Sequence, residues 1–301
     1  MVATEVSRMK MTEVSKMDIM YKTQLMGELK SLLLATDGSQ YSEGAIKEAL
    51  LLAKSCGIKL TLLYVNGLSG GYESGGMTFV EHIDSKLTKY FDDIRELAAE
   101  ENVELDIVIR RTDDTFEGII EESYEKRSDV IIMGRRGMTG LKRMLMGSVT
   151  AKIIAYAPCK VLVVPKDSEV KGERVMLATD GSSFSASAEK EAINMAKRCP
   201  QVKSLTVLSV AQSDTRLPEA QDIVARVKTA AGIAGVKAVT VTGVGNPYEF
   251  IVNKAKELDI NVILMGTHGR TGINRLLMGS VAERVVALSH CSVLVIKESL
   301  Q

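Results

Sequence analysis

Hydrophobic and polar residues alternate along the chain with two different periods. Short apolar runs rich in β-branched residues are typical of buried strands, and longer segments with regularly spaced apolar residues are typical of amphipathic helices. In the first half these patterns predict strands at 31–36, 59–65, 105–109, 130–133 and 160–164, and helices at 42–55, 80–100, 116–126 and 149–156. Because strands alternate with helices, we expect βαβ units with right-handed crossovers and a parallel sheet covered on both faces.

The second half of the chain repeats this order of elements. It predicts strands at 175–179, 204–210, 237–242, 262–265 and 292–296, and helices at 186–197, 219–230, 248–257 and 280–288. The string LATDGS occurs in both halves, and so does LMGSV. We therefore predict an internal duplication, with a leader at 1–29, one domain at 30–166, a charged linker, and a second domain at 174–298.

The composition is that of a soluble globular protein. Of 301 residues, 46% are hydrophobic and 25% are charged, which suits two domains that each have a core. Lysine plus arginine number 38, as do aspartate plus glutamate, so no net field favours nucleic acid or an anionic membrane. No apolar run approaches the ~20 residues that span a bilayer, and the N-terminus lacks a signal-peptide pattern. We therefore expect a cytoplasmic protein with no nucleic-acid or membrane partner.

The four cysteines occupy equivalent positions in the two repeats. Cys56 corresponds to Cys199, and Cys159 corresponds to Cys291. Their spacing matches no zinc-binding pattern. Free cysteine is commonly buried, so we expect inert core thiols and no metal site.

Each repeat contains a strand, a glycine loop and a helix start in direct succession. In the first repeat, Gly134 and Gly137 follow the strand at 130–133, and Gly147 with Ser148 opens the next helix. Glycines let a ligand approach the backbone closely, and a helix start offers unpaired N–H groups and a positive dipole end. Both favour a phosphate. The alternative is a tight turn that binds no ligand.

These motifs resemble those of the universal stress protein family. The resemblance rests on ATDGS after the first strand and on G-x2-G-x9-G-S after the fourth, and it occurs twice between 30 and 298. It implies two tandem doubly wound five-stranded parallel sheets of order 3-2-1-4-5, an adenine-nucleotide alpha-hydrolase-like α/β fold that binds ATP or AMP. It also implies pairing through the final strand, so we expect an intrachain pseudo-dimer of repeats and leave a further homodimer open. In such sheets the ligand crevice lies between the first and fourth strands, where both motifs end.

The residues expected to contact the nucleotide lie at these strand ends and loops. In the first repeat they are Ala35, Thr36, Asp37, Val65, Met133, Gly134, Arg135, Arg136, Gly137, Gly147, Ser148, Val149 and Thr150. In the second repeat they are Thr179, Asp180, Val210, Met265, Gly266, Thr267, His268, Gly269, Arg270, Gly279, Ser280 and Val281. Asp37 and Asp180 are expected to hydrogen-bond adenosine, although a turn or a helix cap is the alternative role for each. Val65 and Val210 are expected to form an apolar wall for adenine.

The loop side chains differ between the repeats. Arg135 and Arg136 are replaced by Thr267 and His268 in the second copy. Because charge-assisted hydrogen bonds are the stronger ones, we expect the first site to favour more phosphates. His268 has no counterpart in the first repeat and is interpreted as a loop histidine, not as a general base.

The leading functional interpretation is a nucleotide-binding regulatory or stress-response protein, not an enzyme, and no catalytic residue is assigned. The loops lack the lysine of a Walker A motif, and no paired carboxylates mark a magnesium site, although Mg²⁺ would accompany bound ATP. The alternative is a slow ATPase or an adenylyl-transfer enzyme related to ATP pyrophosphatases. Residues 69–74, SGGYES, resemble the SGGxDS loop of those enzymes, but they follow the second strand instead of the first.

Overall fold

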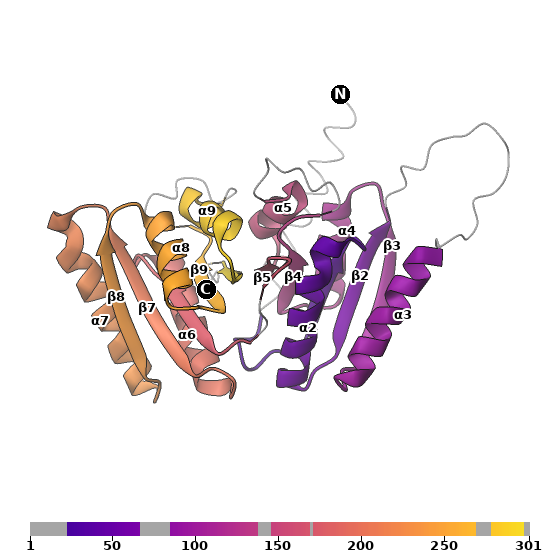
Figure 1. Ribbon diagram of the computed structural model, residues 1–301, viewed down its shortest axis with the longest axis horizontal. Coiled ribbons are helices and arrows are strands. Elements are labelled where there is room, and N and C mark those ends of the chain that lie inside the picture. The colour runs from indigo at the N-terminus through magenta and orange to yellow at the C-terminus, as the bar shows by residue number, and fades with distance from the viewer. Residues whose placement is uncertain (1–22, 67–84, 138–145, 169–170, 269–277, 298–301) are drawn as a thin grey trace, which may run out of the picture.

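The computed structural model describes residues 23–66, 85–137, 146–168, 171–268 and 278–297. Several sequence predictions lie outside these ranges: the SGGYES segment at 69–74, the site residues Gly269 and Arg270, and most of the leader. Figure 1 shows the two halves of the chain side by side, each with strands at its centre and helices outside them.

Every strand and helix predicted from the sequence is found among the described residues, where the helix expected at 80–100 is described from Ser85 onward. The first repeat contains β1 (Leu32–Thr36), η1 (Gln40–Ser42), α2 (Glu43–Cys56), β2 (Leu60–Asn66), α3 (Ser85–Glu100), β3 (Leu105–Arg111), α4 (Thr115–Glu125), β4 (Val130–Gly134), α5 (Ser148–Tyr156) and β5 (Lys160–Val164). The second contains β6 (Arg174–Ala178), α6 (Ser183–Arg198), β7 (Ser204–Ala211), η2 (Asp214–Arg216), α7 (Leu217–Ile233), β8 (Ala238–Val244), α8 (Pro247–Glu257), β9 (Val262–Gly266), α9 (Ser280–Leu288) and β10 (Ser292–Ile296).

Short polar side chains fix the points at which several helices begin. At the start of α4, Asp114 Oδ1 accepts a hydrogen bond from the Phe116 N–H at 2.8 Å. At the start of α6, Ser182 Oγ accepts one from the Ser185 N–H at 3.3 Å. These contacts satisfy N–H groups that have no partner within the helix. At the other end of α2, Gly57 adopts φ 63°, a left-handed conformation that glycine adopts without steric cost.

The strands form one continuous sheet with the order β3-β2-β1-β4-β5-β10-β9-β6-β7-β8. Each half is parallel and has the predicted order 3-2-1-4-5 when it is followed from its outer edge inward. The halves meet at β5 and β10, which pair antiparallel with Leu162 opposite Leu294. The final strands thus join the repeats into an intrachain pseudo-dimer, and each covers an edge that would otherwise be open.

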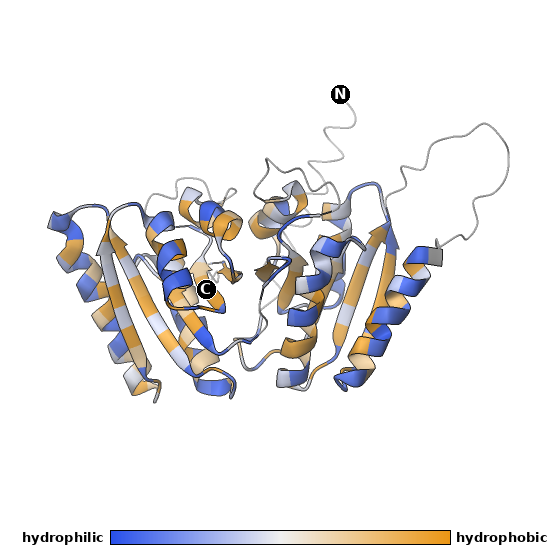
Figure 2. Ribbon diagram, viewed as in Figure 1, coloured by the Kyte–Doolittle hydropathy of each residue, from blue (hydrophilic) through white to orange (hydrophobic). Residues whose placement is uncertain are grey.

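Helices cover both faces of the sheet. α2, α3, α6 and α7 pack on one face, and α4, α5, α8 and α9 pack on the other. In Figure 2 the strands are mostly hydrophobic and the outer sides of the helices are hydrophilic, as the sequence periods require. Cys159, Cys199 and Cys291 are buried and Cys56 is half-buried, all as free thiols. Burial raises the pKa of the Cys159 thiol to about 12, which suits the expected inert role.

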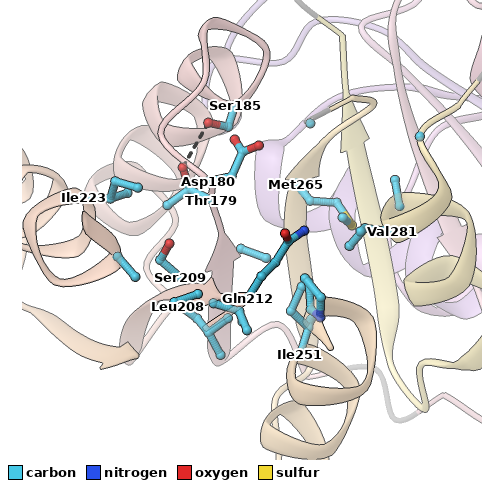
Figure 3. Close-up of a pocket in the computed structure, with 18 of the residues that line it drawn as sticks. Thr179, Asp180, Ser185, Leu208, Ser209, Gln212, Ile223, Ile251, Met265 and Val281 are labelled. Carbon is cyan, nitrogen blue, oxygen red and sulfur yellow. Dashed lines mark hydrogen bonds between the residues drawn. The ribbon is translucent and has the colours of Figure 1, made fainter. Parts of the chain in front are cut away.

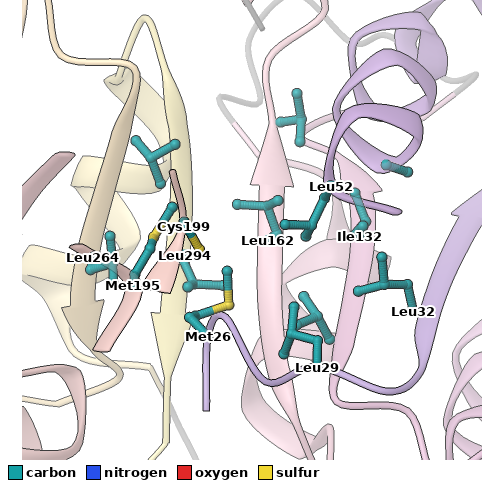
Figure 4. Close-up of a cluster of buried hydrophobic side chains, with 14 of the residues drawn as sticks. Met26, Leu29, Leu32, Leu52, Ile132, Leu162, Met195, Cys199, Leu264 and Leu294 are labelled. Atoms are coloured by element: carbon teal, nitrogen blue, oxygen red, sulfur yellow. The ribbon is translucent and has the colours of Figure 1, made fainter. Parts of the chain in front are cut away.

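Residues 23–29, which the sequence assigned to a leader, pack between the two repeats. The Met26 side chain is 2% exposed and belongs to the core shared by both halves. Figure 4 shows it beside Leu294, at the boundary between the two halves of the sheet. The Met26 N–H donates to Glu191 Oε2 at 2.7 Å, and the Gln24 N–H donates to Asp129 Oδ1 at 2.6 Å. This segment, which we call the N-terminal strap, therefore contacts the second repeat through Glu191 and the first through Asp129.

Candidate functional site

The second repeat has a cavity of about 230 Å³ at the carboxyl ends of its strands. It opens between β6 and β9, where the strand order reverses, and the start of α9 closes one side. All of the described residues that the sequence predicted for this site line the cavity. They are Thr179, Asp180, Val210, Met265, Gly266, Thr267, His268, Gly279, Ser280 and Val281.

The sequence missed the part of the cavity wall that comes from more distant elements. Ile223 on α7 and Ile251 on α8 supply apolar surface, and Gln212 and Arg216 supply polar groups after β7. Figure 3 shows Gln212 extending into the cavity, with Ile223 and Ile251 on different sides of it. No motif marks these residues, because only the packing of α7 and α8 against the sheet brings them to the strand ends.

Asp180 is held by the turn that follows β6. Its Oδ1 accepts hydrogen bonds from the Ser182 N–H at 3.0 Å and from Ser182 Oγ at 2.6 Å. The turn role that we considered as an alternative is therefore present. The carboxylate is only partly buried and lines the cavity as well, so one residue serves both the turn and the site.

The neighbouring Thr179 is held by a network that joins the buried Glu189 carboxylate to the exposed Arg226 guanidinium. Thr179 Oγ1 donates to Glu189 Oε1 at 2.7 Å, and the Arg226 guanidinium binds the same carboxylate with two contacts of 2.8 Å. The hydrogen bonds that Arg226 donates to Glu189 raise the pKa of Arg226. This network connects α6 and α7 to the residue that precedes Asp180.

The fold requires glycine at some positions of the two loops but not at others. A Cβ on Gly134 would lie 2.8 Å from the Tyr41 carbonyl oxygen, and one on Gly266 would lie 2.7 Å from that of Phe184. Those two positions are closed to larger residues by the fold itself. Gly147 has φ −69° and ψ 146°, which any residue adopts, and an added Cβ would meet no atom closer than 3.5 Å. Nothing in the described part of the chain requires glycine at Gly147.

Some of the backbone donors predicted for phosphate are already used. The Gly147 N–H donates to the Arg135 carbonyl at 3.0 Å, and the Gly279 N–H donates to the Thr267 carbonyl at 2.9 Å. The Arg135 N–H donates to the Val164 carbonyl at 3.0 Å. The donors that remain at the helix starts are those of the following residues, Ser148 and Ser280 onward, because the first N–H groups of a helix have no partner within it.

The first repeat brings together a similar set at the ends of β1 and β4. Asp37 Oδ1 accepts from the Ser39 N–H at 3.0 Å, and a Cβ on Gly137 would lie 2.9 Å from Asp37 Oδ2. Thr150 Oγ1 donates to the Gly134 carbonyl at 3.2 Å. Carboxylate, glycine loop and helix start are therefore adjacent, as in the second repeat.

The site residues of the first repeat have more aromatic neighbours than those of the second repeat. Tyr64 pairs with Thr36 across the sheet and stands where the second repeat has Ser209. The Thr36 hydroxyl lies 2.5 Å from the Tyr90 hydroxyl. Ala35 and Met133, both expected at the site, are buried in the core beneath the strand ends, each 6% exposed.

Arg135 and Arg136 line a different cavity, between the two repeats. Arg135 Nη1 donates to the Ser289 carbonyl of the second repeat at 2.6 Å. The expected preference of the first site for more phosphates therefore has no support from these two side chains. In the second repeat, His268 Nδ1 lies 3.1 Å from Thr267 Oγ1, and its ring packs against that of Phe184 at 5.7 Å.

The described residues offer neither a metal site nor a membrane-spanning helix. They contain no group of three or more His, Cys, Asp or Glu side chains placed to hold a metal ion. They also contain no helix that is both long enough and apolar enough to cross a membrane.

Comparison with known proteins gives the same result for both halves. The family model described as "Universal stress protein family" matches residues 28–165 and again residues 172–297. A universal stress protein of Methanocaldococcus jannaschii is 37% identical over 140 residues, which is 42% of this chain and 82% of that protein. The universal stress protein YxiE of Bacillus subtilis is 30% identical over 145 residues, 44% of this chain and 97% of that protein.

Solved structures resemble the chain over almost its whole length. The crystal structure of a universal stress protein from Archaeoglobus fulgidus superposes with a TM-score of 0.67, covering 92% of this chain and 99% of that one at 22% identity. A structure described as a putative universal stress protein from Pseudomonas aeruginosa gives 0.69, covering 90% and 94%, also at 22% identity. At this identity the likeness concerns the fold.

Proposed function

The chain belongs to the universal stress protein family, in a tandem two-repeat form, and on this basis we propose that it is a stress-response protein that binds an adenine nucleotide, ATP or AMP. The proposed sites are the cavity of the second repeat and the equivalent strand ends of the first.

The observation that carries the proposal is the convergence of three kinds of group on one cavity. Asp180 supplies a carboxylate for ribose hydroxyls, Ile223 and Ile251 supply an apolar wall for a base, and the α9 start supplies N–H groups for phosphate. These groups come from four separate elements of the second repeat. A wall of this composition suits a ligand that is flat and apolar at one end and anionic at the other.

The glycine at the helix start is a second support. The described protein has room for a larger side chain at Gly147. Both repeats nevertheless have glycine at this helix start, Gly147 in the first and Gly279 in the second. A phosphate that approaches the backbone at this point would explain the glycine, because any Cβ would lie in its path.

We propose binding without rapid turnover. His268 contacts a threonine hydroxyl and an aromatic ring. Mg²⁺ would enter with ATP instead of occupying a site of its own. A slow ATPase is the alternative, and incubation with ATP and Mg²⁺ separates the two: nucleotide retained in stoichiometric amounts supports binding, and many turnovers per chain support an enzyme.

The binding test is calorimetric titration of the full chain with AMP and with ATP. Gly147→Val places methyl groups at the α5 start, and Gly279→Val does the same at α9. The wild type is expected to bind at two sites, and each variant is expected to weaken one of them by at least about tenfold, or about 1.4 kcal/mol. Gly232→Val is the matched control, because a Cβ there meets no atom within 4 Å.

The outcomes separate the repeats. If Gly279→Val abolishes all binding and Gly147→Val changes nothing, only the second repeat binds nucleotide. If neither variant differs from Gly232→Val, the helix starts do not hold the phosphates and the proposal is wrong.

A further inference from the structure

A second cavity, of about 340 Å³, lies between the two repeats. Its described lining consists of Tyr41, Arg135, Arg136, Pro165, Lys166, Asp167 and His290. Four parts of the chain meet here: η1, the loop after β4, the linker after β5, and the turn between α9 and β10. We refer to it as the inter-repeat cavity.

The described lining is strongly cationic. It includes two arginines and one lysine against a single carboxylate, Asp167, and His290 adds a further group that can carry positive charge. Arginine stays protonated at every physiological pH, so this charge is permanent. Like charges placed together repel one another unless an anion lies between them.

Arg136 carries the clearest sign of a missing partner. Its Nε atom is buried, yet no hydrogen-bond acceptor reaches it among the residues that the structure describes. A buried donor without an acceptor loses its contacts with water and gains nothing in return. Buried polar atoms in proteins nearly always have a partner, and an ion is one of the common explanations for an exception.

Arg135 and Lys166 are held in position by protein contacts, but each has further N–H donors. Arg135 Nη1 donates to the Ser289 carbonyl at 2.6 Å, which fixes its guanidinium across the boundary between repeats. Lys166 Nζ donates to Gln40 Oε1 at 2.6 Å and lies 5.9 Å from the centre of the Tyr41 ring. Burial, and after it the charge of Arg136, lower the pKa of Arg135.

The pseudo-symmetric position lacks this charge. There the two arginines are replaced by Thr267 and His268, Tyr41 by Phe184, and His290 by Pro158. The two repeats therefore share this loop, but only the first repeat has arginines in it. This asymmetry distinguishes the inter-repeat cavity from the general basic surface of a soluble protein.

We propose that the inter-repeat cavity binds a phosphate group, either inorganic phosphate or the phosphate of a small phosphomonoester. Guanidinium groups match the oxygens of phosphate with paired N–H donors, and a lysine adds a mobile point charge. The cavity volume exceeds that of a phosphate ion, so part of a small organic group fits as well. This cavity shares no lining residue with the cavity of the second repeat.

The test is calorimetric titration of the full chain with sodium phosphate at fixed ionic strength, in a buffer without phosphate. The wild type is expected to bind one phosphate per chain. Arg136→Gln and, independently, Lys166→Gln are expected to weaken that binding by at least about tenfold, the loss of a charge-assisted contact. Lys237→Gln removes one exposed positive charge elsewhere and is expected to change nothing. Circular dichroism and thermal unfolding check that each variant is folded.

Further titrations separate the sources of the anion and the possible sites. Glycerol phosphate binding more tightly than inorganic phosphate identifies a phosphomonoester as the ligand, and the reverse order identifies the free ion. Phosphate binding is expected to survive Gly147→Val and Gly279→Val. No saturable binding by the wild type overturns the proposal. So does equal binding of acetate, or loss of phosphate binding in a glycine variant while Arg136→Gln retains it.

Discussion

Lys160 Nζ of the first repeat lies 3.1 Å from Glu191 Oε1 of the second, and the two side chains are only 3% and 6% exposed. Glu191 Oε2 also accepts the Met26 N–H, and Lys160 also donates to the Gln24 carbonyl. The ion pair therefore joins both repeats to the N-terminal strap. The pseudo-symmetric positions are Ser292 and Glu48, where a serine stands in place of the lysine. The approximate symmetry between the two repeats is therefore broken at this ion pair.

Removing one partner of this pair is expected to destabilise the whole chain. Glu191→Ala leaves the Lys160 ammonium buried without a carboxylate, which costs about 3–5 kcal/mol of unfolding free energy. The double variant Lys160→Met with Glu191→Leu is expected to recover most of that loss, because it leaves no uncompensated charge. Urea unfolding followed by circular dichroism measures both. Equal losses in the single and double variants would show that packing, and not charge, governs this position.

Glu48 is expected to make stability depend on pH. Burial raises the pKa of its carboxyl from 4.5 to about 7. In the unfolded chain it ionises near the lower value, so between pH 4.5 and 7 the folded state binds more protons than the unfolded state. The unfolding free energy therefore falls as pH rises through this window, by up to about 3 kcal/mol at roughly 1.4 kcal/mol per pKa unit.

Glu48→Gln tests this directly. The variant cannot ionise, so its unfolding free energy at pH 8 is expected to exceed that of the wild type, and its change between pH 5 and 8 should be smaller. The matched control is Glu43→Gln on the exposed side of the same helix, which should follow the wild-type pH dependence. If Glu48→Gln and Glu43→Gln give the same profile, ionisation of Glu48 does not limit stability.

The N-terminal strap is expected to contribute to stability through Met26. Truncating a fully buried methionine removes its packing and leaves a cavity, at a cost of about 2–5 kcal/mol. Met26→Ala should lower the unfolding free energy by that amount in urea. Leu25→Ala is the control, since the adjacent Leu25 is 38% exposed and should change stability by much less. A similar small effect for both variants would mean that the strap is dispensable.

Arg226 is expected to influence the second-repeat cavity without touching it. Arg226→Met leaves the buried Glu189 carboxylate without its two guanidinium contacts and loosens Thr179, which precedes Asp180. We expect weaker AMP binding at the second site and unchanged binding at the first. Lys228→Met, an exposed lysine on the same helix, is the control. If both variants bind AMP as the wild type does, the network stabilises the fold but does not shape the site.

The sequence by itself determined the elements, their order and the places where the repeats carry glycine. Strand and helix periods are local properties, and the spacing from Gly134 to Ser148 recurs from Gly266 to Ser280. Once the strand order 3-2-1-4-5 is known, Asp180 and Gly279 must meet at the same edge of the sheet. This is why the residues expected around the second cavity line it.

Only the tertiary structure decided which residues are in contact between the repeats and which residues of α7 and α8 line the second-repeat cavity. Arg135 was expected to face a nucleotide, but its guanidinium reaches Ser289, 154 residues away. Met26 packs in the core although its surroundings in sequence resemble a leader, and Lys160 finds its carboxylate on the other repeat. Each of these contacts depends on how β5 meets β10, a pairing that fixes the position of one repeat against the other. The spacing of apolar residues within a segment does not predict these contacts. They join residues of the two repeats across a boundary that forms only when both halves have folded.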